Sequence, residues 1–484
     1  MHGSTGYNNY RQNNQQPPGG GEKRGGGRGR RGRRRSRDLH GFRDSEFQNH
    51  QNTSTKNDDQ QEQKPPPPCT EFDKAYFHSY AHVGIHEEMI KDRVRTETYK
   101  AAVMQHQSFI EGKVVMDVGC GTGILSIFCA QAGAKRVYAV DASDIAVQAN
   151  EVVKANNLAE RVIVLHGRVE DVEIDEEVDV IISEWMGYML LYESMLGSVI
   201  TARDRWLKRG GLILPCNATL YMAPITHPVR YQDSIEFWRN VYGIDMSAML
   251  QLAKLCAFEE PCVETITGEN VMTWPHVVKH VDCYTIQLHE LESVSTRYKF
   301  QSMMRAPLHG FGFWFDVEFS GPANSPTNNP TQPLLFGISN NNPVDGIPRK
   351  KRSNPNEALV LSTAPEDPPT HWEQTLIYFF DPIEVEQDQI IEGSLTLSQS
   401  KENRRFMNIH LEFTFEVLST EASQTDHISS TSVSSCQRAW YFWCDPSLDL
   451  GNKSDLITIQ SCAKMKAIFE TKVDEILTLP LLVV

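Results

Sequence analysis

The sequence lacks the cysteine patterns that build metal sites and disulfide frameworks. Ten cysteines are scattered over 484 residues, with no C-x-x-C pair and no Cys/His cluster at zinc spacing. Scattered thiols are typical of reduced nuclear or cytosolic proteins. The sequence also lacks any apolar run near the roughly 18 residues of a membrane span, and its amino terminus is not apolar. We therefore expect a soluble intracellular protein with no metal site and no membrane contact.

Positive charge is scarce outside one segment. The formal net charge is −15, yet residues 22–37 hold nine Lys/Arg against one Glu, so this segment contributes +8 and the remaining residues −23. An acidic body favours basic peptide partners and opposes broad nucleic-acid binding outside the basic arm.

We predict that residues 1–70 are disordered, because they have too little apolar surface to offset the entropy of ordering. The Pro/Asn/Ser-rich insertion 321–356 is too long for an ordinary connection, and we predict that it is disordered as well. Residues 1–70 contain the Arg/Gly run Arg24–Arg35, which could bind RNA, direct nuclear import, be a methylation substrate, or only solubilise the chain. The insertion 321–356 carries the basic cluster Arg349–Arg352, either a second import signal or solvated charge. The tail 417–484 is polar, with no motif, and we expect it to be poorly ordered.

Residues 71–215 have the periodicity of a helical segment followed by an alternating α/β domain. Helical spacing of apolar residues over 71–110 predicts helices that precede the domain. Over 111–215, helices between apolar strands predict a parallel sheet with right-handed crossovers. The expected strands are Lys113–Val118, Arg136–Val140, Arg161–His166 and Val178–Ser183, and the expected helices are Ile124–Ala132 and Asp144–Asn156.

Residues 216–416 have a different texture, with short β-rich segments between turn residues. This pattern predicts a mainly antiparallel sheet or barrel. A helical excursion over about 237–262 is either core or a dimerisation arm. The expected strands are Thr219–Ala223, Cys283–Leu288, Gly310–Phe319, Thr375–Phe380 and Ile409–Phe415.

A glycine-rich run, Asp117–Gly123, joins the first expected strand to the first helix. Glycines there let the backbone approach a ligand closely, and Asp141 at the end of the next strand could hold ribose hydroxyls. The spacing is G-x-G-x-G, with Ile124 where a dinucleotide fingerprint has its third glycine, which weakens a reading as an NAD site. A ligand with a ribose and a base would account for Asp141 and for Glu170 after the third strand, whereas a solvated loop would account for Glu170 alone.

The loop Ser183–Glu193 follows a strand that we expect to be buried. Its carboxylates, Glu184 and Glu193, bracket three aromatic side chains. Carboxylates accept paired N–H bonds from a guanidinium, and aromatic faces attract positive charge, so the loop could bind a planar cation. The alternative is an ordinary hairpin with one core glutamate and one solvated glutamate.

From about Asp73 to Phe415, apart from the insertion, the chain resembles the type I protein arginine N-methyltransferases. The motifs that carry the resemblance are Tyr76-Phe77-x-Ser79-Tyr80, the run Val118–Gly123, Ser183–Tyr188 with Glu193, and Thr370-His371-Trp372. The resemblance implies a Rossmann-like S-adenosylmethionine-dependent methyltransferase domain, a β-barrel domain and a helical dimerisation arm. It also implies transfer to arginine in histones and Arg/Gly-rich proteins, with mono- and asymmetric dimethylarginine and S-adenosylhomocysteine as products. A nuclear homodimer is implied, with the cytoplasm as a second location.

The resemblance also implies roles for individual residues. Asp92 would pair with His371, either as a proton relay or as a structural pin over the site. Many relatives have Glu at the position of Asp141, whose shorter side chain still accepts two hydroxyls. The implied cofactor-binding residues are His86, Arg95, Gly119, Asp141, Val169 and Glu170. The implied catalytic residues are Glu184, Glu193 and His371, and the implied substrate-pocket residues are Tyr80, Met89, Tyr188, Met195 and Trp372.

The carboxyl-terminal segment leaves a second function open. Relatives usually end soon after the strand near Ile409–Phe415, so the last barrel strand could be missing here, with an exposed sheet edge as the consequence. The alternative to an active enzyme is a catalytically impaired isoform that acts as an RNA-binding or scaffold protein through its Arg/Gly arm.

Overall fold

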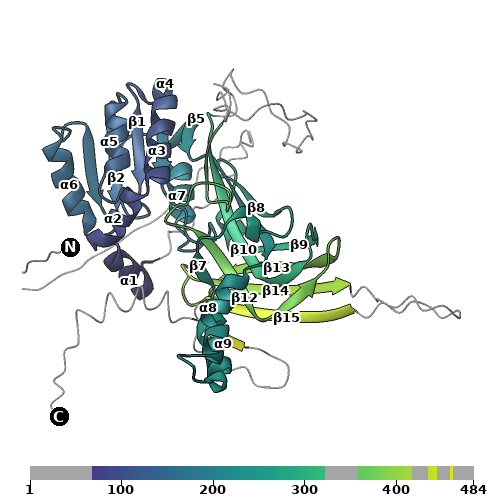
Figure 1. Cartoon of the computed structure of the whole chain (residues 1–484). Helices are drawn as coiled ribbons and strands as arrows, with labels where there is room; N and C mark the ends of the chain where they lie inside the picture. The colour runs from purple at the N-terminus through teal and green to yellow at the C-terminus, as the bar shows by residue number, and fades with distance from the viewer. Residues whose placement is uncertain (1–67, 322–357, 417–433, 444–457, 462–484) are drawn as a thin grey trace, which may run out of the picture. The chain divides into compact units, whose positions relative to one another are not determined.

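The computed structural model describes residues 68–321, 358–416, 434–443 and 458–461 (Figure 1). The first described segment is helical, as predicted. A capping box opens it, in which Thr70 and Asp73 bond each other's backbone N–H groups. Its helices are α1 (Glu71–Ser79), α2 (Val83–Lys91), α3 (Arg93–Gln105) and α4 (Gln107–Ile110).

A five-stranded parallel sheet follows, in the order β3-β2-β1-β4-β5. The chain reverses its winding direction between β1 and β4, and ligands bind at such a switch point, beyond the carboxyl ends of the strands. The predicted parallel α/β domain is confirmed. Its elements are β1 (Val114–Val118), α5 (Ile124–Gln131), β2 (Arg136–Asp141), α6 (Ile145–Ala155), β3 (Val162–His166), β4 (Val178–Ser183), α7 (Leu196–Trp206) and β5 (Leu207–Leu214).

Antiparallel sheets follow, and the predicted barrel domain is confirmed. One sheet has the order β7-β12-β10-β6-β8, with β11 on β10, and the other has the order β16-β15-β14-β13-β9. Buried aromatic side chains fill the space between them, including Phe311, Phe313 and Phe413. The strands are β6 (Asn217–Ile225), β7 (Cys262–Glu264), β8 (His276–Asp282), β9 (Ser293–Gln301), β10 (Ala306–Phe319), β11 (Leu359–Ser362), β12 (Gln374–Val385), β13 (Ile390–Gln399) and β14 (Met407–Glu416). The short 3₁₀ helices are η1 (Glu236–Arg239), η2 (Ser247–Met249), η3 (Gly268–Asn270) and η4 (Leu288–Leu291).

The predicted strand at Cys283–Leu288 is wrong. The strand in this region, β8, ends at Asp282, where the chain turns. The Asp282 carboxylate accepts bonds from the Tyr284 N–H and the Thr285 hydroxyl, and such a side-chain turn competes with strand pairing.

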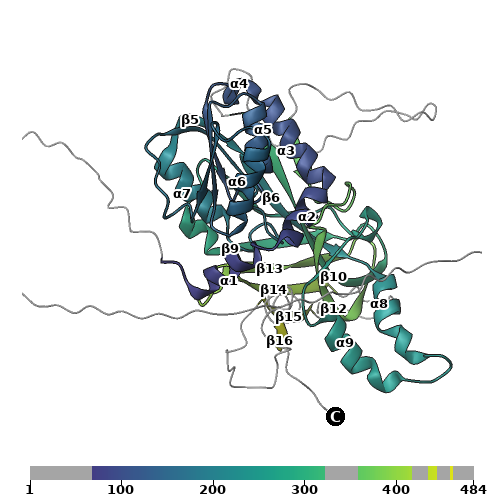
Figure 2. The ribbon, with the colours of Figure 1, turned by 90° about the vertical axis from the view of Figure 1, so that its left-hand side faces the viewer.

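The helical excursion is present but begins earlier than predicted. Figure 2 shows α8 (Pro228–Ser234) and α9 (Leu250–Phe258) side by side, extending from the antiparallel sheets. Tyr231 of α8 stacks on Phe258 of α9, with ring centroids 4.4 Å apart. The prediction missed α8 because the helix is short and few apolar residues mark it, although Pro228 at its start is a common first residue of a helix.

Two further strands lie within the tail that we expected to be poorly ordered. β15 (Ser434–Trp443) pairs antiparallel with β14, and β16 (Thr458–Ser461) pairs parallel with β15. The structure therefore differs from the expected exposed edge at β14. Aromatic residues have high strand propensity, and all four residues of Trp440–Trp443 are aromatic. The Arg/Gly arm, the insertion with its basic cluster and the rest of the tail lie outside the described residues.

No helix in the described part of the chain is long and apolar enough to cross a membrane. In the same residues, no three His, Cys, Asp or Glu side chains are grouped so that they could hold a metal ion.

Candidate active site

One cavity of about 370 Å³ collects every residue that the sequence analysis assigned to the site. The carboxyl ends of the parallel strands form one wall. Helices α1 to α3 and the loop before β12 contribute the others. The assigned residues that line it are Tyr80, His86, Met89, Arg95, Gly119, Asp141, Val169, Glu170, Glu184, Tyr188, Glu193, Met195, His371 and Trp372.

The glycine turn after β1 forms a cradle that side chains would fill. Gly119 and Gly121 have φ values of +72° and +53°, which L-residues rarely adopt. A Cβ on Gly119 would lie 2.0 Å from the Met195 methyl group, and one on Gly121 would lie 3.1 Å from the His86 ring. The Gly121 N–H donates to Asp141 at 2.8 Å, so the turn and this carboxylate form one unit. The bare backbone of this turn thus lines the cavity next to Met195 and His86.

Glu170 also lines the cavity, and hydrogen bonds hold its side chain and backbone. Its Oε1 accepts the Ser198 hydroxyl at 2.7 Å, and its Oε2 accepts Arg168 Nε at 3.3 Å. Arg205 donates to the backbone carbonyls of Val169 and Glu170 at 3.2 and 3.0 Å. These bonds fix the Glu170 carboxylate and the backbone of Val169 in the cavity wall.

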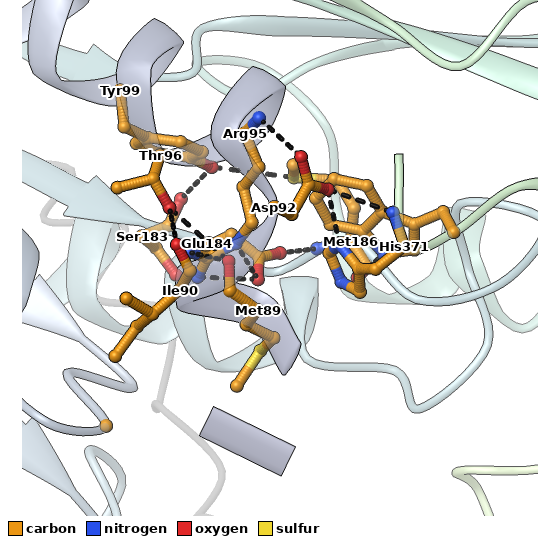
Figure 3. A network of polar contacts seen from close by, with 12 residues as sticks. Met89, Ile90, Asp92, Arg95, Thr96, Tyr99, Ser183, Glu184, Met186 and His371 are labelled. Carbon is orange, nitrogen blue, oxygen red and sulfur yellow. Dashed lines mark hydrogen bonds and ion pairs between the residues drawn. The ribbon is translucent and has the colours of Figure 1, made fainter. Parts of the chain in front are cut away.

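Glu184 already has a guanidinium partner in this structure. Arg95 donates Nε to Glu184 Oε2 at 3.1 Å, and its Nη2 lies 3.1 Å from the same oxygen (Figure 3). Both side chains are buried. The other oxygen of Glu184 accepts the Met186 N–H at 3.2 Å. The resemblance implied that Arg95 binds the cofactor, whereas in this structure Arg95 pairs with Glu184. The contact shows that Glu184 can bind a guanidinium in this cavity.

Glu193 is the second carboxylate, and two phenols saturate one of its oxygens. The hydroxyls of Tyr76 and Tyr80 both donate to Oε2, each at 2.8 Å. Burial raises the pKa of Glu193, and the bonds from Tyr80 and Tyr76 and the charge of Arg405 oppose this shift without cancelling it. Glu184 raises the pKa further, because like charges share the cavity. The pair is therefore a site that a cation would stabilise.

His371 and Asp92 meet as predicted. Asp92 Oδ2 accepts His371 Nδ1 at 2.7 Å and the His371 backbone N–H at 2.9 Å, and Asp92 Oδ1 caps α3 through the Arg95 N–H. Burial raises the pKa of Asp92, but these bonds outweigh burial and lower it. Asp92 therefore ties the turn between α2 and α3 to the loop before β12. Trp372 is buried and donates its indole N–H to the Met186 carbonyl at 3.0 Å.

Two cavity residues whose side chains bond Glu193 received no role in the sequence analysis. Tyr76 lay within a quoted motif but received no role, although it bonds Glu193 as Tyr80 does. Arg405 also lines the cavity, from the turn between β13 and β14. It is more than 200 residues from Glu193 in the sequence, and no local pattern marks it.

Comparisons with known proteins identify the family. Residues 216–334 and 351–420 match the family described as the arginine methyltransferase oligomerization subdomain, and residues 98–200 match that of ribosomal protein L11 methyltransferase. The chain is 79% identical over 346 residues to the probable protein arginine N-methyltransferase 6 of Arabidopsis thaliana, spanning 71% of this chain and 80% of that protein. It is 43% identical to protein arginine N-methyltransferase 6 of Danio rerio over 70% of this chain and 89% of that protein.

Solved structures of protein arginine methyltransferases are also similar to this chain. Arabidopsis thaliana protein arginine methyltransferase 10 is 35% identical, with a TM-score of 0.59 over 76% of this chain and 99% of that chain. The Trypanosoma brucei PRMT1 enzyme–prozyme complex with S-adenosylhomocysteine is 32% identical, with a TM-score of 0.58 over 74% of this chain and 99% of that chain. S-adenosylhomocysteine is what remains of S-adenosylmethionine after methyl transfer. The glycine cradle, Asp141 and Glu170 fit this methyl donor, and S-adenosylmethionine is the cofactor. The resemblance seen in the sequence is confirmed, and the chain belongs to the protein arginine N-methyltransferases.

Proposed function

We propose that the chain is a type I enzyme, which forms monomethylarginine and then asymmetric dimethylarginine in basic proteins. The observation that carries the proposal is the common cavity, onto which both the glycine cradle and the carboxylates of Glu184 and Glu193 open. Methyl transfer needs a donor and a guanidinium in line, and alignment of this kind can supply roughly 7–11 kcal/mol of the barrier.

Donor binding is assigned to one end of the cavity. S-adenosylmethionine supplies an electrophilic methyl group on a sulfonium. Gly119 would lie against the methionine portion, Asp141 would accept the ribose hydroxyls, and Val169 with Glu170 would hold the adenine. His86 and Arg95 would complete the methionine end, Arg95 by pairing with the carboxylate. The cradle and the fixed Glu170 support this division.

Glu184 and Glu193 would hold the substrate guanidinium between them. Arginine is protonated at physiological pH, so its nitrogens are poor nucleophiles. Carboxylates that engage its charge leave lone-pair density on the nitrogen that faces the donor. Tyr80, Tyr188 and Trp372 would line the path of the side chain.

His371 has two compatible roles. Its bonds to Asp92 support a pin between the α2–α3 turn and the loop before β12. Its ring also lines the cavity, where an imidazole can accept the proton that methylation releases.

Met89 and Met195 support the type I assignment, because flexible side chains beside the reacting nitrogen leave room for a second methyl group. Histone tails and Arg/Gly-rich proteins are basic, so they suit an acidic protein as substrates.

A homodimer is supported by the matched oligomerization subdomain and by exposed apolar residues between and on α8 and α9, among them Tyr242, Ile244 and Leu252. We also propose a nuclear location, with the cytoplasm second, and RNA contact through the Arg/Gly arm.

The full chain should transfer label from S-adenosylmethionine to an Arg/Gly peptide. Mass spectrometry should show monomethylarginine first and then dimethylarginine whose fragments carry both methyl groups on one nitrogen. Symmetric dimethylarginine would contradict the type I assignment. No transfer at all would favour the scaffold alternative, which the intact Glu184, Glu193 and glycine cradle oppose. An Arg→Lys version of the peptide is the control.

Tyr80→Phe should move the acid limb of kcat/KM for the peptide to higher pH. Glu193 must be ionised to hold a guanidinium, so activity falls as pH decreases through its raised pKa. The Tyr80 hydroxyl lowers that pKa, so removing it raises the pKa further and activity is lost at a higher pH. Tyr242→Phe, at a fully exposed tyrosine, is the control. An acid limb that stays in place or moves to lower pH would contradict the assignment of Glu193.

A further inference from the structure

Arg405 contacts more of the acceptor site than any role assigned above requires. It lies in the turn between β13 and β14, yet its backbone carbonyl accepts the Glu193 N–H at 2.9 Å. Its Nη1 donates back to the Glu193 carbonyl at 3.1 Å. Arg405 thus holds the backbone of Glu193 at two points.

The backbone that Arg405 holds has an unfavourable conformation at Glu193 and at the next residue, Ser194. Glu193 and Ser194 have φ values of +73° and +55°, in the left-handed region that disfavours side chains. Such residues keep their conformation only when surrounding contacts enforce it. The Arg404 carbonyl accepts the Ser194 hydroxyl, and Gln399 donates to the same hydroxyl at 2.8 Å. The β13–β14 turn therefore enforces the geometry of the Glu193 backbone.

The same guanidinium also holds α1. Arg405 Nε and Nη2 each lie 2.8 Å from Asp73 Oδ1, and Asp73 is part of the capping box of α1. The guanidinium carbon lies 3.8 Å from the centroid of the Tyr76 ring, over which it stacks. Tyr76 is one of the two phenols on Glu193. One side chain thus links the helix that supplies the phenols to the loop that supplies the carboxylate.

We propose that Arg405 is a positioning residue for methyl transfer, which clamps α1 and the Glu193 loop to each other and so presents one oxygen of Glu193 to the substrate guanidinium. Both phenols point at Oε2, so the clamp directs the other oxygen, Oε1, to the acceptor. The planar guanidinium of arginine is needed for this role. Nε and Nη2 bind Asp73, Nη1 binds the Glu193 carbonyl, and the face of the group stacks on the Tyr76 ring. The inference rests on the function proposed above.

The test compares Arg405→Ala, Arg405→Lys and the control Arg305→Ala in the full chain. Arg305 is a mostly exposed barrel arginine paired with Glu386 at 3.3 Å. Arg405→Ala should lower kcat/KM for the peptide about 100-fold, the scale of a misplaced catalytic group, with donor affinity unchanged in calorimetry. Its acid limb should move to higher pH, because a positive neighbour of Glu193 is lost. Arg405→Lys keeps the charge, so its kcat/KM should fall while the acid limb stays in place.

Hydrogen exchange gives a readout that needs no methyl transfer. In Arg405→Ala, amides of α1 and of the Glu193 loop should exchange faster, while those of the parallel sheet stay protected. An Arg405→Ala enzyme that matches Arg305→Ala, an acid limb that does not move, or equal loss of donor and peptide affinity would overturn the inference. Wild-type kcat/KM in Arg405→Lys would also overturn it, even if Arg405→Ala failed to fold. An inactive wild type would instead overturn the proposed function, and unchanged α1 exchange in Arg405→Ala would then overturn the clamp separately.

Discussion

Glu193→Gln should lower kcat/KM for an arginine peptide about 100- to 1,000-fold, the loss expected when one preorganised charged contact to the reacting group is removed. Donor affinity should stay at the wild-type level, because the bonds of Glu193 are made with Tyr76, Tyr80 and Arg405 and not with the glycine cradle. Steady-state kinetics with a labelled donor measure the first quantity, and calorimetry measures the second.

The size of this effect follows from the two phenols. A glutamine has one acceptor oxygen, and the hydroxyls of Tyr76 and Tyr80 both require an acceptor where Oε2 now lies. The amide oxygen therefore takes that position, and the NH₂ group turns toward the substrate. Two groups that only donate would then face each other, since a guanidinium has no acceptor. The substitution replaces attraction by repulsion without changing the volume of the side chain.

Glu184→Gln is the informative comparison. It should lower peptide turnover as strongly, but it should also weaken donor binding, because Glu184 holds Arg95 through both Nε and Nη2. A buried guanidinium that loses its charged partner is costly and shifts position. Equal donor affinity in the two variants would contradict the linked role of Arg95, and donor affinity lost in Glu193→Gln would contradict the assignment of Glu193 to the acceptor.

Local patterns predicted the fold where local chemistry decides it. The apolar strand Val178–Ser183 was placed at its observed bounds, because a strand buried on both faces reads as a continuous apolar run. The predicted strand at Cys283–Leu288 failed because the Asp282 side chain turns the chain there, a bond that hydrophobic periodicity does not report. Helix α8 was not predicted, because its sequence pattern is weak. Tertiary contacts, such as Tyr231 on Phe258, stabilise this short helix.

In the site, too, local motifs predicted some residues and missed others. Gly119, Asp141, Glu184 and Glu193 follow strand ends in sequence motifs, so their common location could be predicted. The pairing of Arg95 with Glu184 could not, because a guanidinium in a cavity chooses among carboxylates by distance alone. No sequence signal marks Arg405. Its contact with Glu193 depends on how the β13–β14 turn packs against a loop more than 200 residues away in the sequence.

Gly187→Ala should lower kcat/KM for peptide methylation about 100-fold, although Gly187 has no side chain that could bind either substrate. It lies in the loop between Glu184 and Glu193 and forms a bridge with Leu190. A Cβ there would lie 2.0 Å from the carbonyl oxygen of Tyr192, whereas real Cβ contacts are essentially never under 3.0 Å. The backbone next to Glu193 must therefore move by about 1 Å, and a displacement of that size can cost about 100-fold in rate.

The loop cannot absorb this shift elsewhere. Glu193 is held from the other side by both backbone bonds to Arg405, so the added methyl group pushes against a fixed neighbour. Overpacking of this kind costs about 1–3 kcal/mol of stability, which lowers the melting temperature but leaves the protein folded. Gly268→Ala is the matched control, because its Cβ would meet Glu366 at an ordinary 3.9 Å and, like Gly187, Gly268 does not have a positive φ. Kinetics, calorimetry of donor binding and thermal melts of both variants measure the effect. Wild-type turnover in Gly187→Ala would show that the two carboxylates need no fixed spacing, which would contradict an acceptor site built from a rigid carboxylate pair.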